Sequence, residues 1–260
     1  MNRHSKLENR KIEVVENENY IKYIFKELKE KDELIQAFSL RYIVYRYVNY
    51  IEENKDLIEI DGYDLYSTFF GCFEQIGKSK KIIGTMRIIS PQERSGCYDV
   101  VKEIMSEITD PNVINNFKRQ EKYPLLESFK ISKQFIKEFT YPQKEYLQKG
   151  YTTDLFELSR LSVLPEFWGS KLKIEQGFHD MTILNAWISK PKKNFFILAT
   201  HPRNKRKYEK IGFSVIPGTK EIIYKKLNQF AIAMILNMEK YLNQPNPYLN
   251  RCKKILTSYK

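Results

Sequence analysis

The chain has 260 residues and a mass of 31.1 kDa, a size that one α/β domain with an insertion can fill. Hydrophobic residues make up 42% of it and charged residues 29%, a globular composition that excludes wholesale disorder. The formal net charge of +12 predicts an acidic partner, which can be nucleic acid, anionic lipid or an acidic protein.

Several kinds of protein and site are excluded by what the sequence lacks. It has no run of about 18 apolar residues that would span a membrane, and its charged N-terminus lacks the apolar core of a secretory signal. Cys72, Cys97 and Cys252 are widely spaced and form neither a disulfide framework nor a zinc motif, so a cytoplasmic location is expected. With three histidines in the whole chain, we expect no metal site.

The first part of the chain predicts a polar arm, a helix and a hairpin. Residues 1–17 offer little to bury and are expected to form the arm. Between Lys31 and Tyr50, apolar residues recur at helical spacing. Leu65–Phe73 is rich in aromatic residues, a turn at Gly77–Lys80 follows, and Lys81–Ser90 returns as a second strand. We expect these two strands to form an antiparallel hairpin near the centre of a sheet.

The remainder predicts an insertion followed by alternating strands and helices. Residues 91–153 are polar and contain four prolines, so we expect an insertion or lid with short helices such as Val100–Ile108. The elements expected after it are strands at Leu155–Leu164, Asn194–Thr200, Phe213–Ile216 and Glu221–Lys225, helices at Lys171–Ser189 and Lys205–Ile211, and a strand or helix at Phe230–Met238. This order predicts an α/β fold with a partly antiparallel sheet, in one domain over residues 18–243, with a basic tail at 244–260.

Three carboxylates, Glu59, Asp61 and Asp64, stand within six residues just before the first expected strand. Such a group is typical of a solvated acidic turn, but it can also bind an amine, ligate a metal or pair with arginines. The further oxygen ligands that an EF-hand needs are missing. Arg87 lies in an apolar strand, where an arginine is either on a solvated face or paired. Pairing of Arg87 with these carboxylates would organise a polar pocket.

The strand at 155–164 contains Glu157, Ser159 and Arg160. A glutamate in an otherwise buried strand is costly without a partner or a purpose. A raised pKa would make Glu157 a general base, and a structural Glu–Arg pair fits the spacing equally well. Because side chains alternate along a strand, Arg160 points away from Glu157 unless a bulge re-aims it.

The turn at 165–172 leads from this strand into the next expected helix and contains Gly169 and Ser170. Backbone N–H groups at a helix N-terminus bind anions, so the turn is a candidate anion site. The same glycine is also what an ordinary strand-to-helix turn requires.

Taken in order, these motifs resemble the GNAT superfamily, and within it the acyl-homoserine-lactone (autoinducer) synthases and the N-acyl amino acid synthases. The motifs that carry the resemblance are Arg41-x-x-x-Tyr45, Glu59-x-Asp61-x-x-Asp64, Gly84-x-x-Arg87, Phe156-Glu157-Leu158-Ser159-Arg160-Leu161, and Ala199-Thr200-His201-Pro202 followed by Tyr208-x-x-x-Gly212-Phe213. They span about residues 34–216 outside the insertion. Their order and spacing are more specific than any one of them.

The resemblance implies a GNAT-like three-layer α/β/α sandwich with a mixed, centrally splayed sheet, and transfer of a fatty acyl chain from a pantetheine thioester to an amine. It implies a substrate-binding site that consists of Arg41, Tyr45, Glu59, Asp61, Asp64 and Arg87. Glu157 and Arg160 would be catalytic, with Glu157 helping to deprotonate the attacking amine. The thioester and its pantetheine arm would be bound by Leu161, Ser162, Val163, Gly169 and Ser170, and apolar side chains would line an acyl tunnel.

Two departures from the family pattern concern the acceptor and the donor. Autoinducer synthases carry a tryptophan, associated with binding S-adenosylmethionine, shortly after their R-x-x-x-F pair, and residues 47–51 here contain none. An amino acid or similar small amine is therefore the expected acceptor, with an autoinducer synthase as the alternative. Residues 166–171 keep one glycine of the coenzyme A loop, which favours a donor on acyl carrier protein, a small acidic protein, over acyl-CoA. No bound cofactor is expected.

A basic nucleic-acid-binding protein without catalysis is an alternative from another class. The +12 charge, 18 tyrosines and 16 phenylalanines suggest it, because such proteins combine basic and aromatic residues on one stripe. Here the basic residues are spread along the chain, with modest clusters at Lys190–Lys193 and Arg203–Lys210. We therefore expect only non-specific binding of nucleic acid.

Overall fold

The computed structural model describes residues 11–16, 21–90, 95–118, 123–131, 155–169, 174–189, 192–224, 229–244 and 250. The contacts of the chain divide it into two compact units. The first unit comprises residues 1–88, 93–119 and 160–181, and the second comprises residues 89–92, 120–159 and 182–260.

The first unit contains an antiparallel sheet that begins with β1 (Lys11–Glu16) and β2 (Ile21–Leu28). Strand β2 pairs antiparallel with β3 (Ser67–Ile76), placing Phe25 opposite Cys72. A two-residue turn with Gly77 at φ +58° then leads into β4 (Ser79–Ile89), a left-handed conformation that suits glycine. The sheet continues beside the last part of β5 (Leu155–Val163), where the backbone N–H of Leu164 donates to the carbonyl of Ile83 at 2.9 Å.

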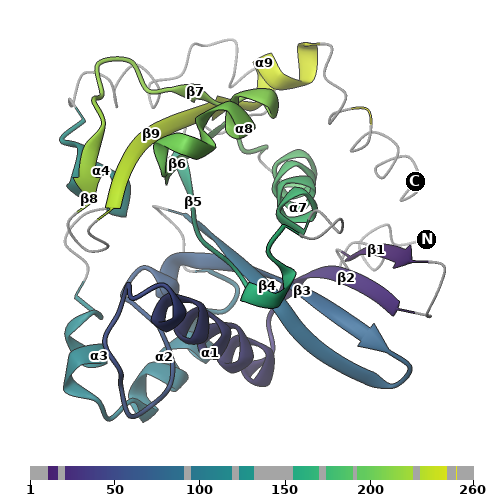
Figure 1. Ribbon diagram of the computed structural model, residues 1–260, viewed down its shortest axis with the longest axis vertical. Coiled ribbons are helices and arrows are strands. Elements are labelled where there is room, and N and C mark those ends of the chain that lie inside the picture. The colour runs from purple at the N-terminus through teal and green to yellow at the C-terminus, as the bar shows by residue number, and fades with distance from the viewer. Residues whose placement is uncertain are drawn as a thin grey trace. The chain divides into compact units, whose positions relative to one another are not determined.

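Helices pack on this sheet through buried apolar and aromatic side chains. The elements are α1 (Lys31–Tyr47), the short η1 (Asp64–Tyr66), α2 (Tyr98–Glu107), α3 (Pro111–Asn115), η2 (Pro165–Phe167) and the start of α7 (Ile174–Ile188). Helix α1 contacts α2, and both lie in the lower part of Figure 1. The rings of Phe38 on α1 and Phe69 on β3 meet edge to face at 5.5 Å between centroids.

Helix α7 lies against β2 through a glycine. A Cβ atom at Gly177 would lie 2.2 Å from the ring of Phe25, so only glycine allows this approach. The next residue, Phe178, meets the same ring edge to face at 5.5 Å between centroids. The ring of Phe25 on β2 therefore packs directly against α7 at Gly177 and Phe178.

The second unit contains a mixed sheet. The first residues of β5 pair parallel with β6 (Phe195–Thr200), and β6 pairs antiparallel with β9 (Gln229–Asn237). The short strands β7 (Ser214–Val215) and β8 (Ile222–Tyr224) also pair with β9. Its helical elements are α4 (Pro124–Phe129), the end of α7, η3 (Pro202–Asn204), α8 (Lys205–Lys210) and α9 (Met238–Asn243). All of them except η3 are labelled in Figure 1.

The predicted mixed α/β class is confirmed, and the expected helices and strands are present with small differences in their ends. The segment that allowed a strand or a helix, Phe230–Met238, is a strand that ends where α9 begins. Two strands were not expected: β1 lies within the predicted polar arm, and β2 was not assigned. Helices α2 and α3 of the predicted insertion belong to the first unit and α4 belongs to the second.

The domain bounds predicted from the sequence, 18–243 with an insertion at about 91–153, remain a prediction, and most of the basic tail lies outside the described residues. None of the helices described here is long and apolar enough to cross a membrane.

Candidate functional site

The carboxylates of residues 59–64 form a buried loop rather than a solvated acidic turn. Backbone bonds fix its path: Glu59 N donates to the carbonyl of Phe38 on α1 at 3.1 Å, and Gly62 N donates to the carbonyl of Asn116 at 3.0 Å. Within the loop, Asp61 Oδ1 accepts from the backbone N–H of Tyr63 at 2.9 Å. Because aspartate readily makes such local bonds, the sequence itself turns the chain and aims its carboxylates inward.

Two arginines occupy the inside of this loop. Arg41 on α1 donates from Nη1 and Nη2 to the two oxygens of Asp64 at 2.9 Å each, and from Nε to Glu59 at 2.6 Å. Arg87 on β4 donates from Nη1 to Asp61 and to Asp64, at 2.7 Å each, and from Nη2 to Asp61 at 3.0 Å. The predicted pairing of Arg87 with the acidic loop is therefore present, and Arg41 joins it.

Burial and charge act in opposite directions on these groups. Burial alone would raise the pKa of Asp64 and Asp61, but the neighbouring arginines outweigh it and hold both pKa values below the usual range of an aspartate. Burial likewise would lower the pKa of Arg87, and Asp61 and Asp64 outweigh it and raise that pKa. All these groups therefore stay ionised at neutral pH.

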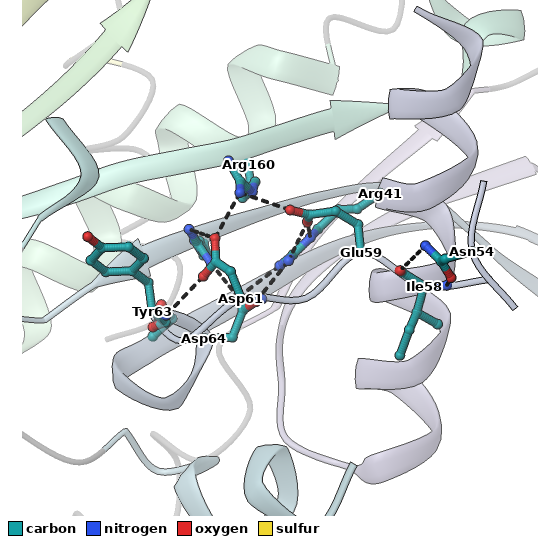
Figure 2. A network of polar contacts seen from close by, with 10 residues as sticks. Arg41, Asn54, Ile58, Glu59, Asp61, Tyr63, Asp64 and Arg160 are labelled. Carbon is teal, nitrogen blue, oxygen red and sulfur yellow. Dashed lines mark hydrogen bonds and ion pairs between the residues drawn. The ribbon is translucent and has the colours of Figure 1, made fainter. Parts of the chain in front are cut away.

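Arg160, from β5, closes the outer side of the cluster. Its Nη2 atom lies 2.8 Å from Glu59 Oε1 and 2.8 Å from Asp61 Oδ2, and Figure 2 shows the side chain joined to both carboxylates. The guanidinium lies over the ring of Tyr45, 5.5 Å from its centroid. The backbone at Arg160 has φ +57°, a rare conformation for a residue with a side chain, and it interrupts the alternation of the strand. This backbone conformation marks an irregular point in β5.

The first unit therefore brings together Arg41, Tyr45, Glu59, Asp61, Asp64, Arg87 and Arg160. Among the described residues, three arginines face three carboxylates, so their charges balance. Replacing a buried pair as a whole can be tolerated, but leaving one buried charge without its partner is strongly destabilising. The buried pairs of Arg41 and Arg87 with Asp61 and Asp64 are therefore expected to stabilise the fold.

Glu157, the predicted base, lies in the part of β5 that belongs to the second unit. It is buried, and its Oε2 accepts a hydrogen bond from the backbone N–H of Leu125 at 3.1 Å. Leu125 stands at the start of α4, which the hydroxyl of Tyr123 ties to β5 by donating to the carbonyl of Leu155. The bond from Leu125 holds one carboxylate oxygen of Glu157 in a fixed direction.

Of the predicted thioester-binding residues, Ser162 and Val163 are buried, Leu161 is half-buried and Gly169 is exposed. Ser162 Oγ is buried and makes no hydrogen bond in the described structure. Gly169 has φ +70°, so the turn does use its left-handed conformation. Ser170 lies outside the described residues.

Three contacts that position these groups were not foreseen from the sequence. The N–H of Leu125 and the hydroxyl of Tyr123 come from the insertion, about which only polarity was evident. Trp168 Nε1 donates to the carbonyl of Val163 at 2.7 Å and its ring meets Tyr47 edge to face. For the contact of Trp168 with Val163, the only indication in the sequence was a tryptophan five residues after the end of a strand.

No group of three or more described His, Cys, Asp or Glu side chains is arranged to hold a metal ion. The carboxylates of the acidic loop, which could have been ligands, are engaged by Arg41, Arg87 and Arg160.

No family model matches the sequence, and no curated protein matches it. Among solved structures, FeeM, an N-acyl amino acid synthase from uncultured soil microbes, is 14% identical with a TM-score of 0.57, over 90% of this chain and 100% of that chain. BjaI, a CoA-dependent acyl-homoserine lactone synthase solved with SAM and isopentyl-CoA, is 14% identical with a TM-score of 0.50, over 88% of this chain and 83% of that chain. TofI, solved in a ternary complex with an inhibitor and MTA, is 11% identical with a TM-score of 0.50, over 83% and 91%. The chain therefore has the GNAT-like fold of these synthases.

Proposed function

We propose that the protein is an N-acyltransferase that moves a fatty acyl chain from an acyl carrier protein thioester to the amine of an amino acid or a similar small molecule. The observation that carries the proposal is the shared fold with FeeM, which covers all of that synthase and 90% of this chain. Two separate features also support the proposal: the buried arginine–carboxylate cluster of the first unit and the buried carboxylate of Glu157 in the second.

In the proposed reaction the amine nitrogen attacks the thioester carbonyl, a C–N bond forms and the C–S bond breaks. The acceptor ammonium gives up two protons: one goes to the departing thiolate and the other reaches solvent. Asp61 is a poor base for this, because its neighbouring arginines hold its pKa low. We assign the base to Glu157, whose position is fixed by the N–H of Leu125.

The thioester end is assigned to the strand that follows Arg160. A thioester oxygen gains negative charge as the amine attacks, and a donor aimed at it stabilises the transition state. Ser162 Oγ is buried and makes no hydrogen bond among the described residues, so it has a proton to donate to the thioester or to a pantetheine carbonyl. Ser162→Ala is expected to lower kcat and to leave the free energy of unfolding nearly unchanged.

The carrier-protein donor is supported by a basic segment in the second unit. Arg203, Lys205, Arg206, Lys207 and Lys210 are exposed on η3 and α8, where Glu209 is the one acidic residue, so the segment has a surplus of four positive charges. Charge complementarity of this kind speeds docking of an acidic protein and weakens with added salt.

The test is mass spectrometry of lipid extracts from cells that express the protein, which reports head group and chain length together. Purified protein is then assayed for thiol release with acyl carrier protein and acyl-CoA donors, each with a panel of amino acids and with S-adenosylmethionine. Formation of an N-acyl amino acid supports the proposal, whereas formation of an acyl-homoserine lactone would replace it with the autoinducer synthase. No thiol release with any pair of substrates would refute it.

Variants separate the roles in the same assay. Glu157→Gln is expected to lower kcat about 100-fold or more, in the range usual for loss of a general base. Arg206→Glu with Lys210→Glu is expected to raise KM for acyl carrier protein about tenfold, with the exposed Lys78→Glu of the β3–β4 turn as the matched control. If the double variant raises KM for acyl-CoA and leaves KM for acyl carrier protein unchanged, the donor assignment is wrong.

A further inference from the structure

One nitrogen atom of the cluster lies where a nitrogen atom of a bound molecule could lie instead. Nη2 of Arg160 bridges Glu59 Oε1 and Asp61 Oδ2, at 2.8 Å from each, and each of these oxygens belongs to a different residue of the acidic loop. Two carboxylate oxygens that converge on a single nitrogen are also the arrangement that binds a primary ammonium, which has three N–H donors.

Of the three arginines in the cluster, Arg160 has the most exposed side chain. Its side chain is 18% exposed, whereas those of Arg41 and Arg87 are 1% and 0% exposed. Arg41 and Arg87 each hold both oxygens of one aspartate in a bidentate contact, and Nη2 of Arg160 contacts one oxygen of Glu59 and one oxygen of Asp61. Arg160 also comes from the irregular point of β5, at φ +57°.

The charges that remain when Arg160 moves away favour a cation in its place. Among the described residues, Arg41 and Arg87 would then face Glu59, Asp61 and Asp64, which leaves one negative charge in excess. Asp64 is 0% exposed and accepts four hydrogen bonds, two from Arg41, one from Arg87 and one from the backbone N–H of Asp61, so it is not available to a substrate. The excess charge is therefore presented by Glu59 Oε1 and Asp61 Oδ2, the two atoms that Arg160 had bridged.

We propose that the ammonium group of the acceptor replaces Nη2 of Arg160 between Glu59 and Asp61, and that the displaced guanidinium binds the carboxylate of the same acceptor. Arg160 is then the residue that selects an acceptor with a carboxylate next to its amine. This inference rests on the proposed function and refines it: an amino acid with a free carboxylate is accepted, and an amine that lacks one is rejected. In the absence of acceptor, Arg160 keeps the buried carboxylates neutralised.

Acceptor binding without turnover tests the exchange. Each of the twenty common amino acids is titrated by calorimetry into the protein, with and without a non-reactive thioether analogue of the acyl donor. The amino acid that binds is then compared with its α-amide and with the decarboxylated amine. A charge-assisted bond between guanidinium and carboxylate predicts about 10- to 100-fold weaker binding of the two analogues.

Variants of Arg160 show whether that preference comes from this side chain. In Arg160→Gln the preference for the free carboxylate is expected to fall to within about threefold, while Arg160→Lys, which keeps the charge and loses the planar fork, retains part of it. Lys78→Gln, which removes a positive charge from an exposed turn, is the control and keeps the full preference. Thermal melting establishes that each variant is folded before its binding is measured.

The outcomes separate this inference from the proposed function. An unchanged carboxylate preference in folded Arg160→Gln, or equal binding of the amino acid and its α-amide by the unaltered protein, would overturn the inference even where acyl transfer occurs. Failure of every amino acid to bind would overturn it as well. Carboxylate-dependent binding that Arg160→Gln abolishes supports the inference, and absence of thiol release in that case would count against the proposed function alone.

Discussion

Asp64 is the residue whose loss should show whether the arginine–carboxylate cluster is a buried structural unit. Its Oδ1 accepts from Arg41 and Arg87 at 2.9 and 2.7 Å, and its Oδ2 accepts from Arg41 and from the backbone N–H of Asp61 at 2.9 and 2.8 Å. In Asp64→Asn one oxygen remains, and the new amide group faces two donors. The side chain is 0% exposed, so water cannot compensate.

The magnitude follows from removing one partner of a buried ion pair, which costs about 3–5 kcal/mol. For a chain of this length each kcal/mol lowers the melting temperature by about 2–4 °C, so a fall of roughly 6–20 °C is expected. The assay is thermal and urea unfolding followed by circular dichroism at pH 7. Glu209→Gln is the control, because its carboxylate lies 3.7 Å from Lys205 on an exposed helix and such pairs contribute about 1 kcal/mol or less. A melting temperature of Asp64→Asn within about 3 °C of that control would refute the reasoning.

Three further predictions concern pH and packing. Burial lowers the pKa of His179 from 6.5 to about 4, so the unfolded chain binds a proton before the folded one does, and stability should fall by at most about 3 kcal/mol as pH falls from 6.5 towards 4. The pKa of Asp61 lies below its unfolded value, so its contribution to stability is complete above about pH 4 and is lost as pH falls further, which acid titration of unfolding free energy should show. Gly177→Ala should destabilise by about 1–3 kcal/mol, although helix propensity alone favours alanine, because its Cβ would meet Phe25 at 2.2 Å.

Each of these has its own control. His179→Gln should flatten the stability profile between pH 4 and 6.5, and an unchanged slope would show that another group titrates there. Asp61→Asn should weaken the acid dependence below pH 4 even though it is less stable throughout. Combining Gly177→Ala with Phe25→Leu should recover part of the loss, and strictly additive losses would mean that the Phe25 contact is not the cause.

Periodicity predicted the elements whose buried faces follow one simple pattern. The helix from Lys31 and the hairpin that contains Arg87 are of this kind. The partnership of Arg87 with the acidic loop was also foreseeable, because an arginine in a buried strand requires a carboxylate. Strand β2 has three buried residues in succession and then two charged ones, so neither the strand nor the helix pattern is clear in it.

The left-handed backbone at Arg160 depends on information that no side-chain pattern carries. A left-handed backbone is typical of glycine or asparagine, and arginine at this position gives no sign of it. The bond from Leu125 to Glu157 joins residues 32 positions apart, one of them in a segment whose only evident property was polarity. Such contacts arise from tertiary packing, and local sequence does not specify them.

The two compact units are not consecutive along the chain, and this limits how the protein can be divided. The chain alternates between them in six segments, with one boundary inside β5, between Ser159 and Arg160, and another inside α7, between Met181 and Thr182. A cut that produced either unit as a separate fragment would sever a strand and a helix and expose their backbone hydrogen-bonding groups. Neither unit can therefore be produced as one continuous segment of the chain.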